Sequence, residues 1–211
     1  MNRIVACITV AFIIIMLLIV IMYPQKIASM TWSDGNYINS DLDDNSYRVI
    51  SAFTNMNIAS NKLSRLNTFN ESLISFLDHK CDSGQCNIQQ RSIRDNLITR
   101  YTSESLIEND PSGTKNTSYT QFKGKILAVC LREKDSGENR FENDESLKFV
   151  DMHELGHISS NSYGHNGEFW SNFEALLHIA EEADLYNPVD YSKYPLRYCG
   201  VDVNTNPYYW D

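Results

Sequence analysis

Basic charge is scarce in this 211-residue chain, and the glycine patterns of nucleotide-binding sites are missing. Asp and Glu number 27 against 18 Lys and Arg, which gives a formal net charge of −9. An acidic chain repels phosphate backbones and gains little from counterion release, so the composition argues against a nucleic-acid partner. The sequence contains no Rossmann or P-loop glycine motif and no internal repeat, which argues against nucleotide-binding and repeat architectures.

Cysteine is also scarce, with five residues and no Cys-x-x-Cys pair, so a structural zinc site made of cysteines has little support. Cys7 lies in an apolar N-terminal segment, which leaves four cysteines for the rest of the chain. Four cysteines allow three pairings. The close spacing of Cys81 and Cys86 predicts a small disulfide loop, and Cys130 could then pair with Cys199. Alternatively, Cys130 is a small buried residue in a strand.

Long apolar runs are absent except at the N-terminus. Residues 4–23 carry no charge and are long enough for one helical crossing of a bilayer, which needs about 20 residues. A cleavable signal peptide has a shorter apolar region, and Ile27-Ala28-Ser29 is a poor cleavage site. We therefore expect a transmembrane anchor over 1–25, a polar stalk over 26–45 and one folded domain over 46–211.

The charges around this segment bear on topology and compartment. Arg3 precedes the span and Lys26 follows it, so the free amino terminus tips the balance and is expected to be cytoplasmic. This single-pass arrangement would make the folded domain lumenal or exterior, in agreement with its even number of cysteines. Sequons at Asn70 and Asn116 are candidates for glycosylation, although such matches are frequent by chance in a chain rich in Asn and Ser.

The strongest chemical signal is the HExxH motif His153-Glu154-Leu155-Gly156-His157. On a helix, residues four apart lie on one face, about one turn apart. Two neutral imidazoles in this arrangement can bind one Zn²⁺, and the carboxylate beside the first can act as general base toward water. The motif predicts His153 and His157 as zinc ligands and Glu154 as the catalytic base. A five-residue motif of this kind can also occur by chance on a solvated helix face. The neighbouring residues must therefore show whether it forms a metal site.

The residues around the motif predict a helix, a loop and a second helix. Asp144 is the expected N-cap of the first helix. Residues 159–164 lack helical periodicity and predict a loop. A second amphipathic helix is expected from Phe169 to about Leu185. The apolar positions at helical spacing in the first helix are Leu147, Val150, Leu155 and Ile158.

A third zinc ligand must come from outside the first helix, because one helical turn offers only two suitable nitrogens. His165 stands where the loop meets the second helix and is the preferred candidate. The alternative ligands are Glu174, Glu181 and Glu182, although adjacent Glu181 and Glu182 also fit a solvated helix face. The two remaining histidines, His79 and His178, are expected to be ordinary surface residues.

These residues resemble the WLM and SprT-like zinc metallopeptidases. The resemblance rests on the HExxH motif, on His165-Asn166-Gly167-Glu168-Phe169-Trp170 and on the apolar strand 126–132, within residues 118–185, about a third of the chain. It implies a zincin fold, with His153, His157 and His165 as zinc ligands and Glu154 as base. The sequence also resembles membrane-anchored metallopeptidases of giant DNA viruses.

The sequence departs from these families at three points. The spacing from His157 to His165 is longer than in the WLM type. Ser160 replaces the glycine of the astacin–adamalysin pattern. The soluble relatives, which are often associated with DNA, lack an apolar first segment.

The remaining segments predict supporting structure. Amphipathic patterns indicate helices over about 60–79 and 87–107, and strands over 118–122 and 125–132 form a possible hairpin. The second strand is the candidate edge strand for an extended substrate. The tail beyond Leu185 is expected to be ordered coil, and its tyrosines or Arg197 could reach the cleft.

The sequence as a whole predicts an α+β, zincin-like fold. A small sheet or hairpin would pack on the HExxH helix and flanking helices, preceded by one transmembrane helix. The predicted function is that of a membrane-anchored zinc endopeptidase acting on a protein or peptide. The alternative is a catalytically silent zincin-fold membrane protein that acts in binding or in virion or surface assembly. A binding protein has no need for the base Glu154, which favours the enzyme. Neither the particular substrate nor the oligomeric state follows from the sequence.

Overall fold

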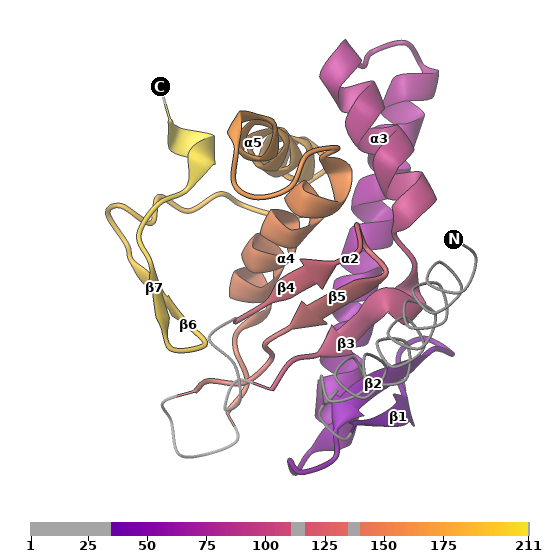
Figure 1. Cartoon of the computed structure of the whole chain (residues 1–211), viewed down its shortest axis with the longest axis vertical. Helices are drawn as coiled ribbons and strands as arrows, with labels where there is room; N and C mark the ends of the chain where they lie inside the picture. The colour runs from indigo at the N-terminus through magenta and orange to yellow at the C-terminus, as the bar shows by residue number, and fades with distance from the viewer. Residues whose placement is uncertain (1–34, 111–116, 135–139, 211) are drawn as a thin grey trace, which may run out of the picture. The chain divides into compact units, whose positions relative to one another are not determined.

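The computed structural model of the chain describes residues 35–110, 117–134 and 140–210. These residues form an α+β fold in which helices pack against a mixed sheet (Figure 1). The elements are β1 (Gly35–Asn39), β2 (Ser46–Ile50), α2 (Met56–Asp82), α3 (Ile88–Arg100), η1 (Ser103–Ser105), β3 (Leu106–Glu108), β4 (Tyr119–Gln121), β5 (Ile126–Val129), α4 (Asp144–Ser159), α5 (Gly167–Glu182), β6 (Leu196–Tyr198), β7 (Val201–Val203) and η2 (Pro207–Tyr209).

The larger sheet has five strands in the order β1-β2-β3-β5-β4. β1 is antiparallel to β2, β3 is parallel to both β2 and β5, and β4 is antiparallel to β5. All four residues of β5 are buried, which suits a continuous apolar strand inside a sheet. The predicted hairpin is present, but the edge strand is β4 and not the predicted second strand, because β5 pairs on both sides.

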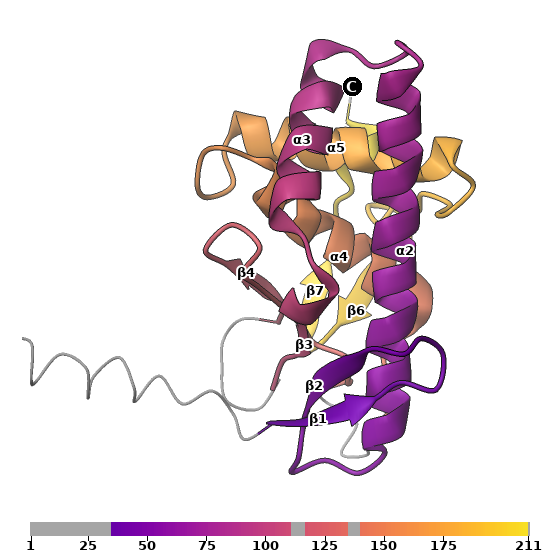
Figure 2. The same ribbon diagram turned by 90° about the vertical axis from the view of Figure 1, so that its right-hand side faces the viewer.

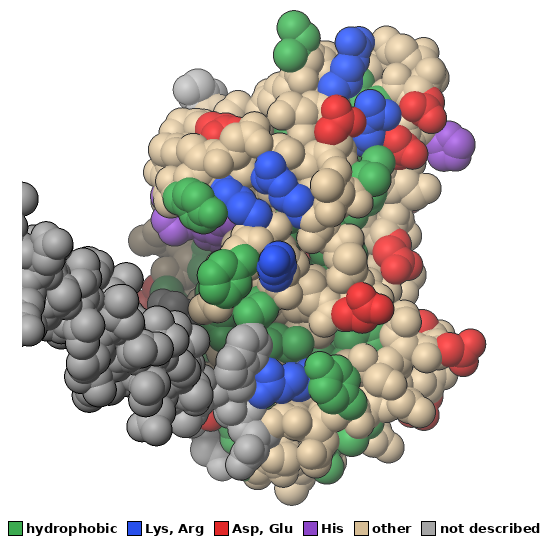
Figure 3. Space-filling model, turned by 45° about the vertical axis from the view of Figure 1, so that its right-hand side comes forward, with side chains coloured by type: hydrophobic (Ala, Val, Ile, Leu, Met, Phe, Trp, Pro, Cys, Tyr) green, Lys and Arg blue, Asp and Glu red, His purple; other side chains and the backbone are tan. Residues whose placement is uncertain are grey.

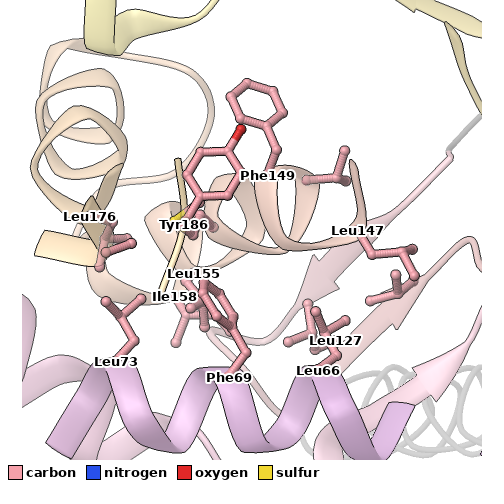
Figure 4. Packing of buried hydrophobic residues seen from close by; sticks show 14 of the residues in the cluster. Leu66, Phe69, Leu73, Leu127, Leu147, Phe149, Leu155, Ile158, Leu176 and Tyr186 are labelled. Carbon is pink, nitrogen blue, oxygen red and sulfur yellow. The ribbon is translucent and has the colours of Figure 1, made fainter. Parts of the chain in front are cut away.

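The core lies between the helices and the sheet. In Figure 2, α2 extends from the β1–β2 hairpin at one end to α3 and α5 at the other. Figure 4 shows Phe69 and Leu73 of α2 directed toward Leu155 and Ile158 of α4. These side chains are almost entirely excluded from water, and burying each one stabilises the fold by about 1.5–3 kcal/mol.

Helix boundaries differ from the sequence expectation where a cap or a long-range pairing intervenes. The N-cap of α4 is Asn143, whose side chain accepts a hydrogen bond from the Ser146 N–H, and Asp144 binds Lys62 instead. The helix predicted over 87–107 ends at Arg100, because residues 106–108 pair with β5 as strand β3.

Part of the predicted polar stalk, residues 26–45, is also structured. Residues 35–39 form β1 and pair with β2 along their whole length. Ile38 packs against the core and its carbonyl accepts a hydrogen bond from Ser60 of α2. Long-range pairing of this kind leaves little trace in a short polar sequence. Residues 26–34 lie outside the described part of the chain.

The prediction of a transmembrane helix and of a single-pass membrane protein with an exterior or lumenal domain is contradicted. Within residues 35–210, as far as they are described, no helix combines the length and apolar character needed to cross a membrane. The longest, α2, has 27 residues but carries charges such as Lys62, Glu71 and Asp78 along its length, whereas a bilayer core requires about 20 mainly apolar residues. The segment predicted to span the membrane, residues 1–25, lies outside the described residues.

Candidate metal centre

The HExxH motif occupies the last turns of α4. His153 and His157 line an open cleft, while Leu155 and Ile158 point into the core. The helix ends at Ser159, and the Ser160 N–H still bonds to the Gly156 carbonyl. This division into a cleft face and a core face is the arrangement that the spacing of the motif predicts.

The loop after α4 folds back and brings His165 to the other two histidines. The Nε2 atom of His165 lies 3.0 Å from Nε2 of His153 and 3.1 Å from Nε2 of His157. Two nitrogens on one tetrahedral zinc ion are about 3.3 Å apart when each Zn–N bond is about 2.05 Å. Among the described residues, these three form the one cluster of histidine, cysteine or acidic groups close enough to hold a metal ion. Their donor set and spacing fit zinc.

The three imidazoles are held in the form that binds a metal. Burial, with the neighbouring His157 and His165, lowers the pKa of His153 to about 3. Burial also lowers the pKa of His157 to about 4 and that of His165 to a smaller extent. All three rings are therefore neutral near pH 7, and a neutral imidazole nitrogen is a metal ligand.

Phe169, in the first turn of α5, packs against all three histidine rings. It stacks on His157 with a centroid separation of 4.1 Å, and it meets His153 and His165 edge-on at 4.8 and 4.6 Å. The Asn166 side chain caps α5 by accepting a hydrogen bond from the Phe169 N–H. This cap sets the start of α5 directly after His165. The cap and the contacts with Phe169 both fix the position of the third histidine.

Two cations from other elements bind the carbonyl end of α4. Lys123, in the β4–β5 turn, donates hydrogen bonds to the carbonyls of His157, Ser160 and Ser162. Arg100, at the end of α3, donates to the carbonyl of Ser160 as well as to that of Ile158. Positive charge at a helix C-terminus is favourable because the helix dipole places partial negative charge there.

Glu168, in the first turn of α5, holds the same loop. Its carboxylate accepts hydrogen bonds from the backbone N–H groups of Asn161 and Ser162 and from the Ser162 hydroxyl. The Asn161 N–H and the other donors lower the pKa of Glu168 to about 2, so the carboxylate is ionised near pH 7. The loop that carries His165 is thus bonded to both the β4–β5 turn and α5.

Glu154 is nearly inaccessible to water, although it is among the residues that line the cleft. Burial, and then the neighbouring Asp151, raises the pKa of Glu154 to about 8, while the Thr120 backbone N–H has the opposite effect. Its Oε2 atom has no hydrogen-bond partner within the described structure. A buried carboxylate with an unpaired oxygen beside three histidines is placed to exchange a proton with a bound water.

The cleft has a volume of about 300 Å³. One wall is the edge strand β4 with the turn that follows it, and the other is α4 with its loop. Figure 3 shows histidine side chains beside hydrophobic and basic ones on this side of the surface. The lining residues are Ser118, Tyr119, Thr120, Phe122, Lys123, His153, Glu154, His157, Tyr163, Gly164 and His165.

The alternative zinc ligands lie elsewhere. Glu182 pairs with Lys80, and Glu181 accepts a hydrogen bond from Tyr208. Glu174 does not belong to the histidine cluster. His79 and His178 are exposed, as expected for surface histidines.

The C-terminal tail contributes nothing to the described cleft lining, contrary to the suggestion that its tyrosines or Arg197 could reach it. The tail forms β6, β7 and η2 rather than coil alone, and Arg197 of β6 pairs with Asp202 of β7. Arg197 and Tyr198 belong to β6, which pairs with β7 in a separate two-stranded sheet, while Tyr186 and Tyr191 are buried in the core.

The structure contains disulfides between Cys81 and Cys86 and between Cys130 and Cys199, the pairing suggested by the spacing. The sequon at Asn70 is not available for glycosylation in this fold. Asn70 is fully buried in α2, and its amide donates to the Tyr101 hydroxyl. Asn116 lies outside the described residues.

Comparisons with known proteins connect the chain to viral proteins without a described function. Uncharacterized protein R325 of Acanthamoeba polyphaga mimivirus is 29% identical over 185 residues, which cover 84% of this chain and 87% of that protein. Uncharacterized protein 136R of Invertebrate iridescent virus 6 is 34% identical over 70 residues, 33% of this chain and 39% of that protein. Uncharacterized protein 042R of Invertebrate iridescent virus 3 is 37% identical over 71 residues, 34% of this chain and 43% of that protein. No family model and no solved structure matches the chain.

Proposed function

We propose that this protein is a zinc-dependent endopeptidase similar to the WLM and SprT-like metallopeptidases. His153, His157 and His165 would hold the metal, and Glu154 would act as general base. The observation that carries the proposal is the convergence of three neutral imidazole Nε2 atoms beside the buried Glu154 carboxylate, in a cleft open to solvent.

Zinc held by the three histidines would supply Lewis-acid chemistry, polarising a peptide carbonyl and acidifying a water molecule. Glu154 would accept the proton that this water loses as it attacks the carbonyl, and would return the proton to the departing amine. A carboxylate suits both steps best when its pKa lies near the working pH. Burial brings Glu154 into that range, since its pKa is about 8.

The edge strand β4 offers a way to orient a peptide. β4 pairs with β5 on one side, and on the other side its Thr120 N–H donates a hydrogen bond to Glu154. An extended peptide can add to such an edge by main-chain hydrogen bonds. A peptide aligned along β4 would pass its carbonyl groups close to Glu154 and the histidines.

The alternative function, a catalytically silent protein acting in binding or virion assembly, makes no use of this arrangement. A binding surface gains nothing from an ionisable carboxyl that is buried beside the cleft, because burial of such a group costs stability. The position of Glu154 therefore favours the enzyme.

The test measures zinc content and peptide cleavage for the full-length chain. We expect one zinc ion per chain by atomic emission and cleavage of a mixed peptide library. Glu154→Gln should retain zinc but lose cleavage by about 10²–10⁴-fold, since this is the usual contribution of a positioned acid–base group.

His165→Ala should lose zinc, whereas His178→Ala, which alters an exposed histidine of α5 outside the cluster, should retain it. Wild-type protein without stoichiometric zinc would overturn the proposal. So would a Glu154→Gln variant that cleaves peptides as fast as the wild type.

A further inference from the structure

Two aromatic side chains on the cleft are largely exposed to solvent. Phe122 is 70% exposed and Tyr163 is 78% exposed, and both line the cleft beside His157 and His165. They belong to opposite walls, because Phe122 lies in the β4–β5 turn and Tyr163 in the α4–α5 loop. Burying these two rings would stabilise the protein, yet both remain in contact with water. Exposed apolar side chains that share a cleft are typical of a ligand-binding site.

The backbone at Phe122 adds a second cost. Phe122, Lys123 and Gly124 have φ values of 50°, 55° and 99°, so three consecutive residues are left-handed. Gly124 suits this conformation, but a bulky residue such as phenylalanine rarely adopts it, and Asn or Gly would be less strained. A phenylalanine that is both strained and exposed does not serve stability, and strain of this kind concentrates at ligand-binding sites.

Tyr163 is held in place from one side. The Lys123 ammonium lies 4.4 Å from the centre of the Tyr163 ring, a cation–π contact. The same ammonium donates to the carbonyl of Ser162, the residue before Tyr163. The ring is therefore oriented before any ligand arrives, and most of its surface remains open, which lowers the entropy lost on binding.

Two charged groups beside the cleft, Lys123 and Glu168, are already engaged within the protein. The Lys123 ammonium bonds to three backbone carbonyls, and the Glu168 carboxylate accepts hydrogen bonds from the loop. The environment around Phe122 and Tyr163 thus favours an uncharged, apolar group over an anion or a cation.

We propose that Phe122 and Tyr163 form a subsite that binds a bulky apolar side chain of the peptide in the cleft. This inference rests on the proposed peptidase function and specifies its substrate class as peptides with a large apolar residue near the scissile bond. Phe122 directly follows Gln121, the last residue of β4. A peptide extended along β4 therefore leads its side chains to this subsite.

Binding to the full-length, zinc-loaded Glu154→Gln variant tests the subsite without cleavage. The probes are fluorescein-labelled decapeptides of Ala, Gly and Ser that carry one central Phe, Leu, Lys or Asp. Fluorescence anisotropy should give a Kd about tenfold or more lower for the Phe and Leu peptides than for the Lys and Asp peptides, from the apolar area they bury.

Adding Phe122→Asn should abolish this preference while leaving the melting temperature unchanged or higher, since Asn tolerates the left-handed conformation. Tyr163→Ala should also weaken the preference. The matched control is Tyr37→Ala, which removes an equally exposed aromatic side chain from β1, the other edge strand of the sheet, and should keep the preference.

The subsite is refuted if Glu154→Gln binds the four peptides equally or binds none of them. It is equally refuted if Phe122→Asn keeps the preference for apolar peptides. Cleavage by the wild type is scored separately. Selective binding without any wild-type cleavage would reject the peptidase function and keep the subsite. Cleavage without selective binding would reject the subsite and keep the peptidase function.

Discussion

Gly156, one of the variable positions of the HExxH motif, has a specific steric role. A Cβ atom at this position would lie 3.2 Å from Cε2 of the Phe169 ring and 3.3 Å from Cβ of Phe173. The missing side chain lets α5 pack closely on α4, and this close approach sets the Phe169 ring against His153 and His157. A residue that looks optional in the motif is therefore needed for the contact between the two helices.

Gly156→Ala should destabilise the protein by about 1–3 kcal/mol, the usual cost of overpacking a close contact, because Phe169 and α5 must shift. Gly167→Ala is the matched control, since a Cβ there has no neighbour within 4 Å. It should change the stability by less than about 1 kcal/mol. Urea unfolding of the full-length chain measures both, and equal losses would contradict the steric explanation.

At the scale of elements, the end of α4 depends on side chains from distant segments. The helix itself follows from its apolar spacing and its Asn143 cap, but the three bonds donated by Lys123 come from the β4–β5 turn. Metal sites need such supporting contacts because they fix the orientation of the ligands. Here they fix the backbone of His157 and the loop that leads to His165.

Lys123→Met should therefore lower both stability and zinc affinity. Leaving the partly buried carbonyls of His157 and Ser162 without this donor costs about 1–3 kcal/mol, although Arg100 still bonds to that of Ser160. The loss of a supporting contact lowers metal affinity by about 10–100-fold. Lys125→Met removes an exposed lysine two residues away and should alter neither property appreciably. Competition with a zinc chelator and urea unfolding provide the measurements. Matching results for the two variants would disprove the supporting role of Lys123.

At the scale of the whole described fold, the Cys130–Cys199 disulfide ties the tail to the central sheet. Tyr198, next to it, donates a hydrogen bond to the Cys130 carbonyl and lies 2.9 Å, oxygen to oxygen, from the hydroxyl of Ser118, a residue of the cleft. Residues separated by 69 positions are thus joined beside the start of β4. The Cys81–Cys86 disulfide closes a loop with a separation of only five positions.

The two disulfides should contribute unequally to stability. Loop-closure entropy predicts a loss of about 4 kcal/mol for Cys130→Ala/Cys199→Ala and about 2 kcal/mol for Cys81→Ala/Cys86→Ala. Guanidinium unfolding of the two double variants measures the difference. An equal or larger loss of unfolding free energy for the Cys81→Ala/Cys86→Ala variant would show that loop-closure entropy does not dominate the stabilisation by the Cys130–Cys199 disulfide.

Some sequence predictions failed where long-range contacts override local patterns. The segment containing β1 looks like a polar stalk, yet it pairs with β2. Asn70 matches a glycosylation sequon, yet tertiary packing buries it against Tyr101. The prediction of a membrane span is contradicted on other grounds, since no helix of the described residues is long and apolar enough to cross a membrane.

The sequence by itself determined the local geometry of the candidate site. His153 and His157 share one face of α4 because a separation of four residues is close to one helical turn, and the Asn166 cap sets the start of α5 next to His165. Only the tertiary structure decided that β4 is the edge strand, that Lys123 binds the end of α4, and that Phe122 and Tyr163 share one cleft. Helical spacing and caps depend on a few neighbouring residues. The order of the strands and the contacts between the two walls of the cleft depend on how distant segments of the chain pack.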